Sequence, residues 1–328
     1  MKKNLFGATS TADDVLNNID LSHKRILVTG TSSGLGVEIA RALTARGAHV
    51  IGTVRHTAKS EKQAHAIRGA NPQGSFELVE LDLSSLASVR TCSDKLLAAG
   101  KPIDIIINNA GVMATPFGHT ADGFETQFGI NHLGHFVLVN RLIPLLNSGA
   151  RVISVSSAGH RLFDFDINDL NFSYTDYQPQ LAYSRSKTAN ILFAVEFDRR
   201  YRNLGIRACA IHPGNIATNL SRNMSAEDQA EIGTMINSLN QQAGLSSLET
   251  KTIPQGAATT VWAAAVADAD EIGGQYCEDC QVAQVNDGPG FFGLRTYAID
   301  PQLAKALWLK SEQMVGETFP QNSSLPIT

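Results

Sequence analysis

The sequence predicts one doubly wound α/β domain, in which about seven parallel strands form a sheet with helices on both faces. First, short apolar runs alternate with segments of helical spacing, and strands covered on both faces are apolar throughout. Second, the composition is 43% hydrophobic and 18% charged, which provides for a large core. Third, no linker or change of composition divides the 328 residues, so one domain is preferred to the two that length alone suggests.

The first strand–helix–strand unit is expected near the N-terminus. Residues 25–30, RILVTG, are a short apolar run that ends in glycine, and residues 48–54, AHVIGTV, are a second run of the same kind. Between them, apolar residues recur at helical spacing over 37–47, where Gly47 is a suitable C-cap. This order predicts two parallel strands joined by a helix.

The same alternation continues along the chain. Five further apolar runs are expected strands: 76–83, 104–111, 150–157, 206–214 and 273–280. Segments of helical spacing separate most of them: 85–100, about 121–147, about 182 to beyond 201, and 254–267. Because helices connect the runs at regular intervals, we expect the strands to be parallel.

Four segments lie outside this alternation. The expected domain covers 24–315, with an N-terminal extension at 1–23 and a frayed C-terminal tail at 316–328. The segments 158–181 and 215–252 are long and follow strand ends, where ligands bind in open α/β sheets, so we expect active-site walls or lids. In the second, helical spacing predicts either an apolar lid face or a plain surface helix: Ile232, Met235, Ile236 and Leu239.

Composition and charge exclude several classes of protein. Lys and Arg total 27 and Asp and Glu total 31, a net charge of −4, which argues against a strongly basic nucleic-acid binder. The N-terminus shows no signal-type apolar run, and no segment approaches the ~18 apolar residues of a membrane span, so we expect a cytoplasmic chain. The four cysteines, Cys92, Cys209, Cys277 and Cys280, are too few for a disulfide scaffold and lack the partners of a zinc site, so no metal is expected.

A glycine-rich turn, TGTSSGLG (29–36), follows the first strand and opens a helix. It contains Gly30, Ser32, Ser33, Gly34, Leu35 and Gly36. Glycines let the backbone approach a pyrophosphate, and free N–H groups at a helix N-terminus favour anions, while the serines add hydroxyl donors. Alone, the motif could be only a tight turn. At the first strand of such a series it predicts dinucleotide binding.

The end of the second strand indicates which dinucleotide is bound. NAD binding favours an acidic residue about 20 positions beyond the turn, but the chain has Thr53, Val54, Arg55 and His56 there. A guanidinium can pair with the 2′-phosphate of NADP as a fork. Arg55 therefore favours NADP(H) over NAD(H). The alternative is an arginine that merely faces solvent at a strand end.

Tyr183 and Lys187 form a Y-x-x-x-K pair. On a helix these positions share a face, so the phenol and the ammonium can meet at one ligand. A nearby cation lowers the tyrosine pKa from about 10, which would let Tyr183 exchange a proton with a substrate oxygen. Such pairs also occur by chance on surface helices. However, Ser157 ends a strand at the same sheet edge, and Asn131 interrupts an otherwise apolar helix, so we take these four as the candidate catalytic set.

Together these motifs resemble the short-chain dehydrogenase/reductase family over about residues 24–285. The matching segments are TGTSSGLG (29–36), LDL (81–83), NNAG (108–111), INHLGHF (130–136), VSS (155–157), YSRSK (183–187) and HPG (212–214) followed by Thr218. The segment TADGFETQFGINHLGHF is most similar to the retinol-dehydrogenase-like branch, whose members often reduce hydrophobic aldehydes and ketones. The resemblance implies a Rossmann-type fold and reversible hydride transfer between NADP(H) and a carbonyl/alcohol pair.

The resemblance also implies a role for each matching residue. Tyr183 would be the general acid/base, Lys187 would hold the nicotinamide ribose and lower the Tyr183 pKa, and Ser157 would orient the carbonyl, with Ser156 as second choice. Asn131 would support a helix distortion and a proton-relaying water. The other cofactor contacts would be Asp82 and Leu83 at the adenine, Asn109, Ala110 and Gly111 on the adenine-ribose side, and Pro213, Gly214, Ile216 and Thr218 at the nicotinamide and diphosphate.

Some features depart from the family pattern. The segment between Ser157 and Tyr183 is long, and Ser33 stands where NADP-preferring members sometimes carry a basic residue. We expect no membrane anchor of the kind found in many retinol-dehydrogenase relatives. The family suggests a homodimer or homotetramer, which the apolar residues 189–197 would allow. The alternative function is a non-catalytic NADP(H)-binding sensor or scaffold, and nothing in the sequence supports a pigment substrate.

Overall fold

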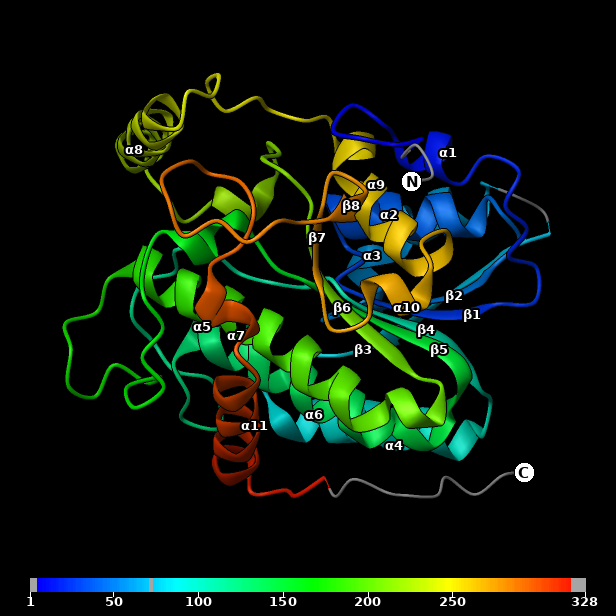
Figure 1. The fold of residues 1–328 in the computed structure, drawn as a ribbon. Helices are drawn as coiled ribbons and strands as arrows, with labels where there is room; N and C mark the ends of the chain where they lie inside the picture. The colour runs from blue at the N-terminus through cyan, green and yellow to red at the C-terminus, as the bar shows by residue number, and fades with distance from the viewer. Residues whose placement is uncertain (1–4, 71–72, 320–328) are drawn as a thin grey trace.

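The computed structural model describes residues 5–70 and 73–319, and their strands form one twisted sheet (Figure 1). The strand order is β3 (Ser75–Glu80), β2 (His49–Val54), β1 (Arg25–Thr29), β4 (Ile103–Asn108), β5 (Leu146–Val155), β6 (Arg207–His212), β7 (Tyr276–Glu278) and β8 (Gln281–Val282). β1 to β7 are parallel. The order reverses between β1 and β4, the switch point at which open α/β sheets bind ligands. The expected fold class is confirmed.

The sheet has eight strands among the described residues, rather than about seven. The expected strand at 273–280 is only three residues long, because the chain turns at Asp279 and Cys280, whose φ angles are 49° and 58°. It then returns as β8, antiparallel to β7. A two-residue strand is too short to leave a hydrophobic pattern, so the sequence does not predict it.

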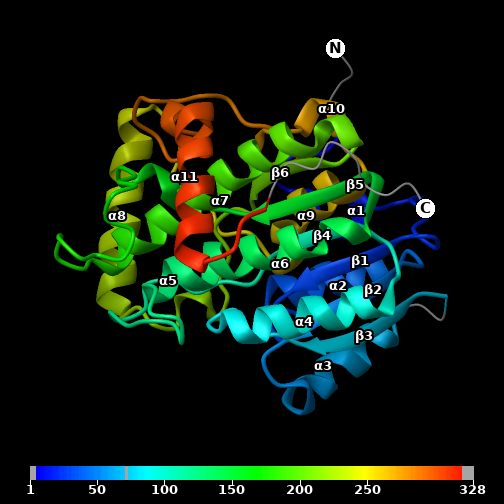
Figure 2. The same cartoon turned by 90° about the horizontal axis from the view of Figure 1, so that it is seen from below.

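Helices cover both faces of the sheet (Figures 1 and 2). On one face lie α4 (Leu86–Ala99), α6 (Gly134–Leu142) and α7 (Pro179–Tyr201). On the other lie α2 (Leu35–Thr44), α3 (Thr57–Arg68) and α9 (Ile253–Ala265), with α10 (Ala269–Ile272) at the margin. β1 serves both cores, because Leu27 faces the first layer and Ile26 and Val28 face the second. This two-sided burial explains why the strands lack polar alternation.

The C-terminal helix α11 (Pro301–Val315) lies against α7 (Figure 2) and is absent from the expected elements. Trp308 packs against Phe193 and Phe197, with ring centroids 6.0 and 6.4 Å apart. Residues 189–197 are therefore covered within the chain, all of them buried except half-buried Val195. Their apolar content is explained by packing within the chain, against α11 on one side and against β6, β7 and the 3₁₀ turn η6 (Thr296–Ile299) on another, and gives no indication of a subunit interface.

Both ends of the described chain are packed. α1 (Ala12–Val15) has a capping box between Thr11 and Asp14, and its apolar side joins the core beneath α2 and α9. At the other end, Glu317 pairs with Arg90 at 2.5 Å and Arg141 at 2.8 Å. The start of the tail that we expected to fray is thus held by two ion pairs, whereas 320–328 lie outside the described residues.

The helix expected over about 121–147 is divided. α5 (Thr126–Phe128) leads into a π-helical turn, η1 (Gly129–Leu133), followed by α6 and the 3₁₀ turn η2 (Ile143–Leu145). β5 begins directly after η2, so it starts four residues before the expected strand. A π-turn often marks a functional site, and here it contains Asn131.

The two long segments follow the carboxyl ends of β5 and β6. The segment 158–181 begins with the 3₁₀ turn η3 (Ala158–Arg161), and 215–252 contains η5 (Asn219–Ser221) and α8 (Ala226–Gln242). Short turns η4 (Arg202–Leu204) and η6 (Thr296–Ile299) follow α7 and precede α11. Figure 1 shows α8 away from the sheet, beside the loop before η6. Of the lid residues expected on α8, Ile236 is buried and Met235 is 39% exposed.

Candidate functional site

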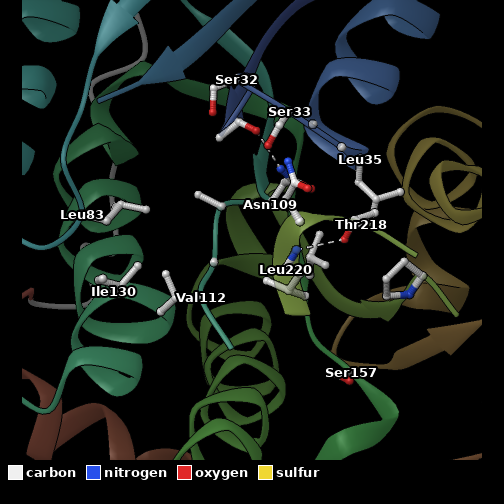
Figure 3. Close-up of a pocket in the computed structure, with 18 of the residues that line it drawn as sticks. Ser32, Ser33, Leu35, Leu83, Asn109, Val112, Ile130, Ser157, Thr218 and Leu220 are labelled. Carbon is white, nitrogen blue, oxygen red and sulfur yellow. Dashed lines mark hydrogen bonds between the residues drawn. The ribbon is translucent and has the colours of Figure 1, made fainter. Parts of the chain in front are cut away.

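A cavity of about 300 Å³ opens at the carboxyl ends of the strands (Figure 3). Every sequence-predicted site residue except Asn131 lines it. Ser156, the second choice for orienting the carbonyl, also lines it, and the other lining residues were not predicted: Thr53, Val54, Leu81, Ser84, Val112, Ile130, Val155, His212, Asn219, Leu220 and Arg222. The site therefore combines segments far apart in the sequence, and the parallel topology explains why they meet at one edge.

The glycine-rich turn is shaped by backbone that only glycine accommodates. Gly30 and Gly34 have φ angles of +75° and +59°, and Gly34 is the N-cap of α2. A Cβ at Gly36 would lie 2.1 Å from the Gly30 carbonyl oxygen, so a side chain there is excluded. Since glycine has no side chain to cap the helix, the first N–H groups of α2 stay available at the cavity, which suits a phosphate.

A hydrogen-bond network joins this turn to the end of β4. The backbone N–H groups of Asn109 and Ala110 both donate to the Thr29 hydroxyl at 2.9 Å. The Asn109 amide donates to the carbonyls of Thr29, at 2.8 Å, and Gly30, at 3.3 Å. Asn109 is thus a brace between two loops. Thr29, 0% exposed, is a site-shaping residue that the sequence reasoning missed, although it begins the TGTSSGLG motif.

The end of the cavity beside β2 and β3 carries the expected charges. Arg55 follows β2, is exposed, and forms no ion pair with any residue that the structure describes. Asp82 accepts hydrogen bonds from the backbone and hydroxyl of Ser84, at 2.9 and 2.7 Å, so its carboxylate braces its own loop. An unpaired guanidinium beside the cavity leaves a full positive charge for an anionic ligand.

Tyr183, Ser157 and Lys187 meet at the other end. Burial raises the pKa of Tyr183 to about 12, and the hydrogen bond with Ser157 acts in the opposite direction. The Lys187 ammonium lies 5.6 Å from the Tyr183 ring centroid and donates to the Val155 carbonyl at 2.9 Å, and its burial lowers the pKa of Lys187 to about 8. Burial is thus the larger influence on the Tyr183 pKa in this structure, and its lowering by Lys187 stays a prediction.

Two further residues position this group. Ser156 donates to the Lys187 carbonyl at 2.7 Å and is 2% exposed, whereas Ser157 is the more accessible of the two serines. Asn131 is 0% exposed; its oxygen accepts from Val112 N–H at 2.8 Å, and its amide donates to the Val112 carbonyl and the Ser186 hydroxyl, both at 2.9 Å. Asn131 thus ties the π-turn to the β4 loop and to α7.

Comparisons with known proteins show the family of this chain. A family model described as short chain dehydrogenase matches residues 24–166. Short-chain dehydrogenase TIC 32 A, chloroplastic, of Brassica napus is 37% identical over 97% of this chain and 96% of that protein. The chain belongs to the short-chain dehydrogenase/reductase family. Retinol dehydrogenase 14 of Mus musculus is 38% identical over 89% of this chain and 86% of that protein, which supports the retinol-dehydrogenase-like branch.

A solved structure that is similar to this one contains NADP. The angucycline C-6 ketoreductase LanV with bound NADP has a TM-score of 0.61 and 26% identity, covering 79% of this chain and 95% of that chain. In the present family member, the glycine turn, the uncapped start of α2 and the unpaired Arg55 fit a nicotinamide dinucleotide. We therefore describe the chain as an oxidoreductase with a nicotinamide dinucleotide cofactor.

The remaining motifs of this family member do not form a second site. Cys92, Cys209, Cys277 and Cys280 are buried, and the parts of the chain that the structure describes hold no group of side chains suited to a metal ion. Burial raises the pKa of Cys280 to about 11, so this thiol is unreactive at neutral pH. No helix within 5–70 and 73–319 is long and apolar enough to cross a membrane.

Proposed function

We propose that this protein is an NADP(H)-dependent oxidoreductase that interconverts a carbonyl and an alcohol on a small hydrophobic substrate. The observation that carries the proposal is one cavity with Tyr183, Ser157 and Lys187 at one end and the unpaired Arg55 at the other. A dinucleotide with a 2′-phosphate matches this distribution of charge and hydrogen-bond donors.

The chemistry assigned to each side chain follows from its protonation state. When bound, the nicotinamide donates or accepts the hydride. With a pKa of about 12, Tyr183 is protonated at neutral pH and can donate its proton to a carbonyl oxygen during reduction. Ser157 can donate a hydrogen bond to the same oxygen. Lys187, with a pKa of about 8, is positively charged at pH 7 and would hold the nicotinamide ribose hydroxyls. Oxidation requires the phenol to lose its proton, so its rate should rise with pH.

The substrate wall is anchored to the catalytic turn. Arg161, 5% exposed, ends the turn that starts after Ser157. Its guanidinium donates to the carbonyls of Gly290, Asn286 and Gly288, at 3.1, 2.6 and 3.0 Å. The same loop donates from the Phe291 N–H to Asn240 of α8 at 2.7 Å. These contacts link α8 to the Ser157 turn and support α8 as a lid whose position depends on that turn.

A substrate panel tests the proposed activity. Purified chain is mixed with NADPH and aldehydes or ketones, or with NADP⁺ and the corresponding alcohols, and the nicotinamide absorbance is followed. We expect turnover of apolar members of the panel. If the chain binds NADPH but converts none of the compounds, the alternative of a non-catalytic NADP(H)-binding sensor or scaffold is favoured instead.

Replacing Arg55 with glutamate tests the cofactor preference. Arg55→Glu removes the cation assigned to the 2′-phosphate and adds a carboxylate that can bind a ribose hydroxyl. We expect the NADPH-to-NADH preference in Kd to fall by about 100-fold, since charge-assisted phosphate contacts contribute about 1.5–3 kcal/mol and the new charge is repulsive. Lys62→Glu, an exposed site on α3 outside the cavity lining, is the matched charge control. An unchanged preference would show that Arg55 does not select the cofactor.

The expected assembly and location are part of the proposal. A homodimer or homotetramer is supported only by the resemblance to the family, because the apolar residues 189–197 are buried within the chain, in part by α11. Light scattering of the purified chain distinguishes these states from a monomer. The cytoplasmic location stays a prediction, since the Brassica napus relative is named chloroplastic; fractionation of cells expressing the natural protein tests it.

A further inference from the structure

Some charged residues that line the cavity have an assigned ligand group and one does not. Besides Tyr183 and His212, the ionisable lining residues are Arg55, Asp82, Lys187 and Arg222. Arg55 lies at the end of β2, and Lys187 lies beside Tyr183, bonded to the Val155 carbonyl. A dinucleotide carries two further negative charges at the diphosphate in its middle. There the glycine turn provides only the partial charge of α2 and the hydroxyls of Ser32 and Ser33. Of the lining cations, this leaves Arg222 without an assigned partner.

Arg222 is carried on residues 218–223, which we call the strap. The strap leaves the β6 side of the cavity at Thr218, whose methyl carbon would lie 3.7 Å from a Cβ at Gly34. Its other end is fixed because the Asn223 amide donates to the Met113 carbonyl, in the loop after β4, at 3.0 Å. Figure 3 shows Thr218 beside Leu35, at the start of α2, with Leu220 next to it. The strap thus joins the β6 side of the mouth to the loop after β4, with the phosphate-binding turn beside its first residue.

The Arg222 guanidinium is available for an anion. Its side chain is exposed and lines the cavity, and among the described residues its guanidinium forms one hydrogen bond, from Nη1 to the Asn219 carbonyl at 3.0 Å. No described carboxylate forms an ion pair with it. The remaining guanidinium N–H groups form a fork suited to phosphate oxygens. An exposed cation that lines the same cavity as a helix N-terminus and a hydroxyl-rich turn complements a diphosphate better than either feature alone.

We propose that Arg222 is a binding residue for the diphosphate of the cofactor, and that the Asn223–Met113 hydrogen bond holds the strap where it can act. This rests on the proposed dinucleotide cofactor but not on catalysis. Arg55 and Arg222 then bind different parts of the cofactor. Arg55 recognises the 2′-phosphate, which is present only in NADP(H), and Arg222 recognises the diphosphate, which NADP(H) and NAD(H) share.

Binding measurements with three probes separate the two arginines. NADPH contains both groups, NADH lacks the 2′-phosphate, and ADP-ribose lacks both the 2′-phosphate and the nicotinamide but retains the diphosphate. By titration calorimetry, we expect Arg222→Met to raise the Kd of all three probes by about tenfold, with partial recovery in Arg222→Lys. Arg55→Met, the matched control, should weaken NADPH alone. The salt dependence of ADP-ribose binding should also decrease in Arg222→Met.

Three results would overturn the inference. In Arg222→Met, unchanged Kd values for NADH and ADP-ribose would mean that Arg222 does not contact the diphosphate. A loss confined to NADPH would assign Arg222 to the 2′-phosphate instead. A wild-type chain that binds none of the probes contradicts the proposed cofactor itself and is therefore distinguishable. Because Arg222 is exposed, we expect an unchanged melting temperature in its variants, which separates lost binding from lost folding.

Discussion

Replacing Tyr183 with phenylalanine is expected to lower kcat by about 10³-fold, the loss typical when a general acid is removed. Tyr183→Phe removes only the phenol hydroxyl, and the aromatic ring that fills the buried site remains. The Kd for NADPH should stay within about twofold, because the phosphate contacts assigned to the glycine turn and Arg55 are untouched. Stopped-flow turnover with the best substrate of the panel and NADPH titration measure the two quantities separately.

A matched control makes the Tyr183 result specific. Tyr174→Phe deletes the same atom from a side chain that is 86% exposed and outside the cavity, and it should keep full activity. The pH profile gives a second readout. Because burial raises the pKa of Tyr183 to about 12, oxidation by the wild type should increase from pH 7 to 10, and this increase should be absent in Tyr183→Phe. Full turnover by Tyr183→Phe would disprove the assignment of Tyr183 as acid/base.

Acid is expected to unfold the protein well above the range in which most carboxylates titrate. His132, His135 and His160 are at most 3% exposed, and burial lowers their pKa values to about 3, 4 and 3. The two ring nitrogens of His135 form hydrogen bonds with the Asn131 carbonyl, at 3.0 Å, and with the Thr29 hydroxyl, at 2.9 Å. His160 accepts from the Arg295 N–H at 3.3 Å. An added proton would break that last contact and place a charge in the core.

The sign follows from proton binding. Between the folded pKa values and 6.5 the unfolded chain binds more protons, so stability falls as the pH falls through this window. At pH 5 each of the three histidines should lower the free energy of unfolding by about 2 kcal/mol, roughly 6 kcal/mol together. That is comparable to the total stability of many domains. Burial raises the pKa values of Glu125 and Glu278, which opposes part of the effect.

Urea unfolding at pH 7, 6 and 5, followed by circular dichroism, measures this loss. His132→Gln can keep a hydrogen bond with Ser311, 2.8 Å from the ring nitrogen, and should remove about a third of the pH dependence. His23→Gln, on an exposed side chain, is the control and should change nothing. Equal free energies of unfolding at pH 5 and pH 7 would contradict the expected charging of the buried histidines.

The sequence predicts the elements whose signal is local. The glycine turn, the Y-x-x-x-K pair and most strands depend on neighbours within a few positions, where glycine φ, helical spacing and apolar runs act directly. Even the π-turn at Asn131 has a local sign in the sequence, a polar residue within an apolar segment. The elements that sequence reasoning missed carry weak local patterns: α3 is mostly polar, α11 lies after an irregular region, and β8 has two residues.

The contacts within the candidate site also differ in whether neighbouring residues in the sequence can predict them. Three sets of hydrogen bonds join residues far apart in the chain: those of the Thr29 hydroxyl with Asn109 and Ala110, those of Arg161 with the loop at 286–290, and that of Asn223 with Met113. Nothing in the local sequence around Arg161 or Arg222 states which loop will lie against it. The protonation of Tyr183 is of the same kind, since the Y-x-x-x-K spacing predicts a lowered pKa but burial raises it.

By itself, then, the amino-acid sequence determined the doubly wound class, the glycine-rich turn and the family, because these depend on short-range spacing and on the composition of individual strands. Only the tertiary structure decided that α11 covers α7, that Lys187 is bonded to Val155 and not to the phenol, and that Arg222 lies at the cavity. The physical reason is that burial and long-range hydrogen bonds depend on which segments pack together, and the sheet order determines that packing.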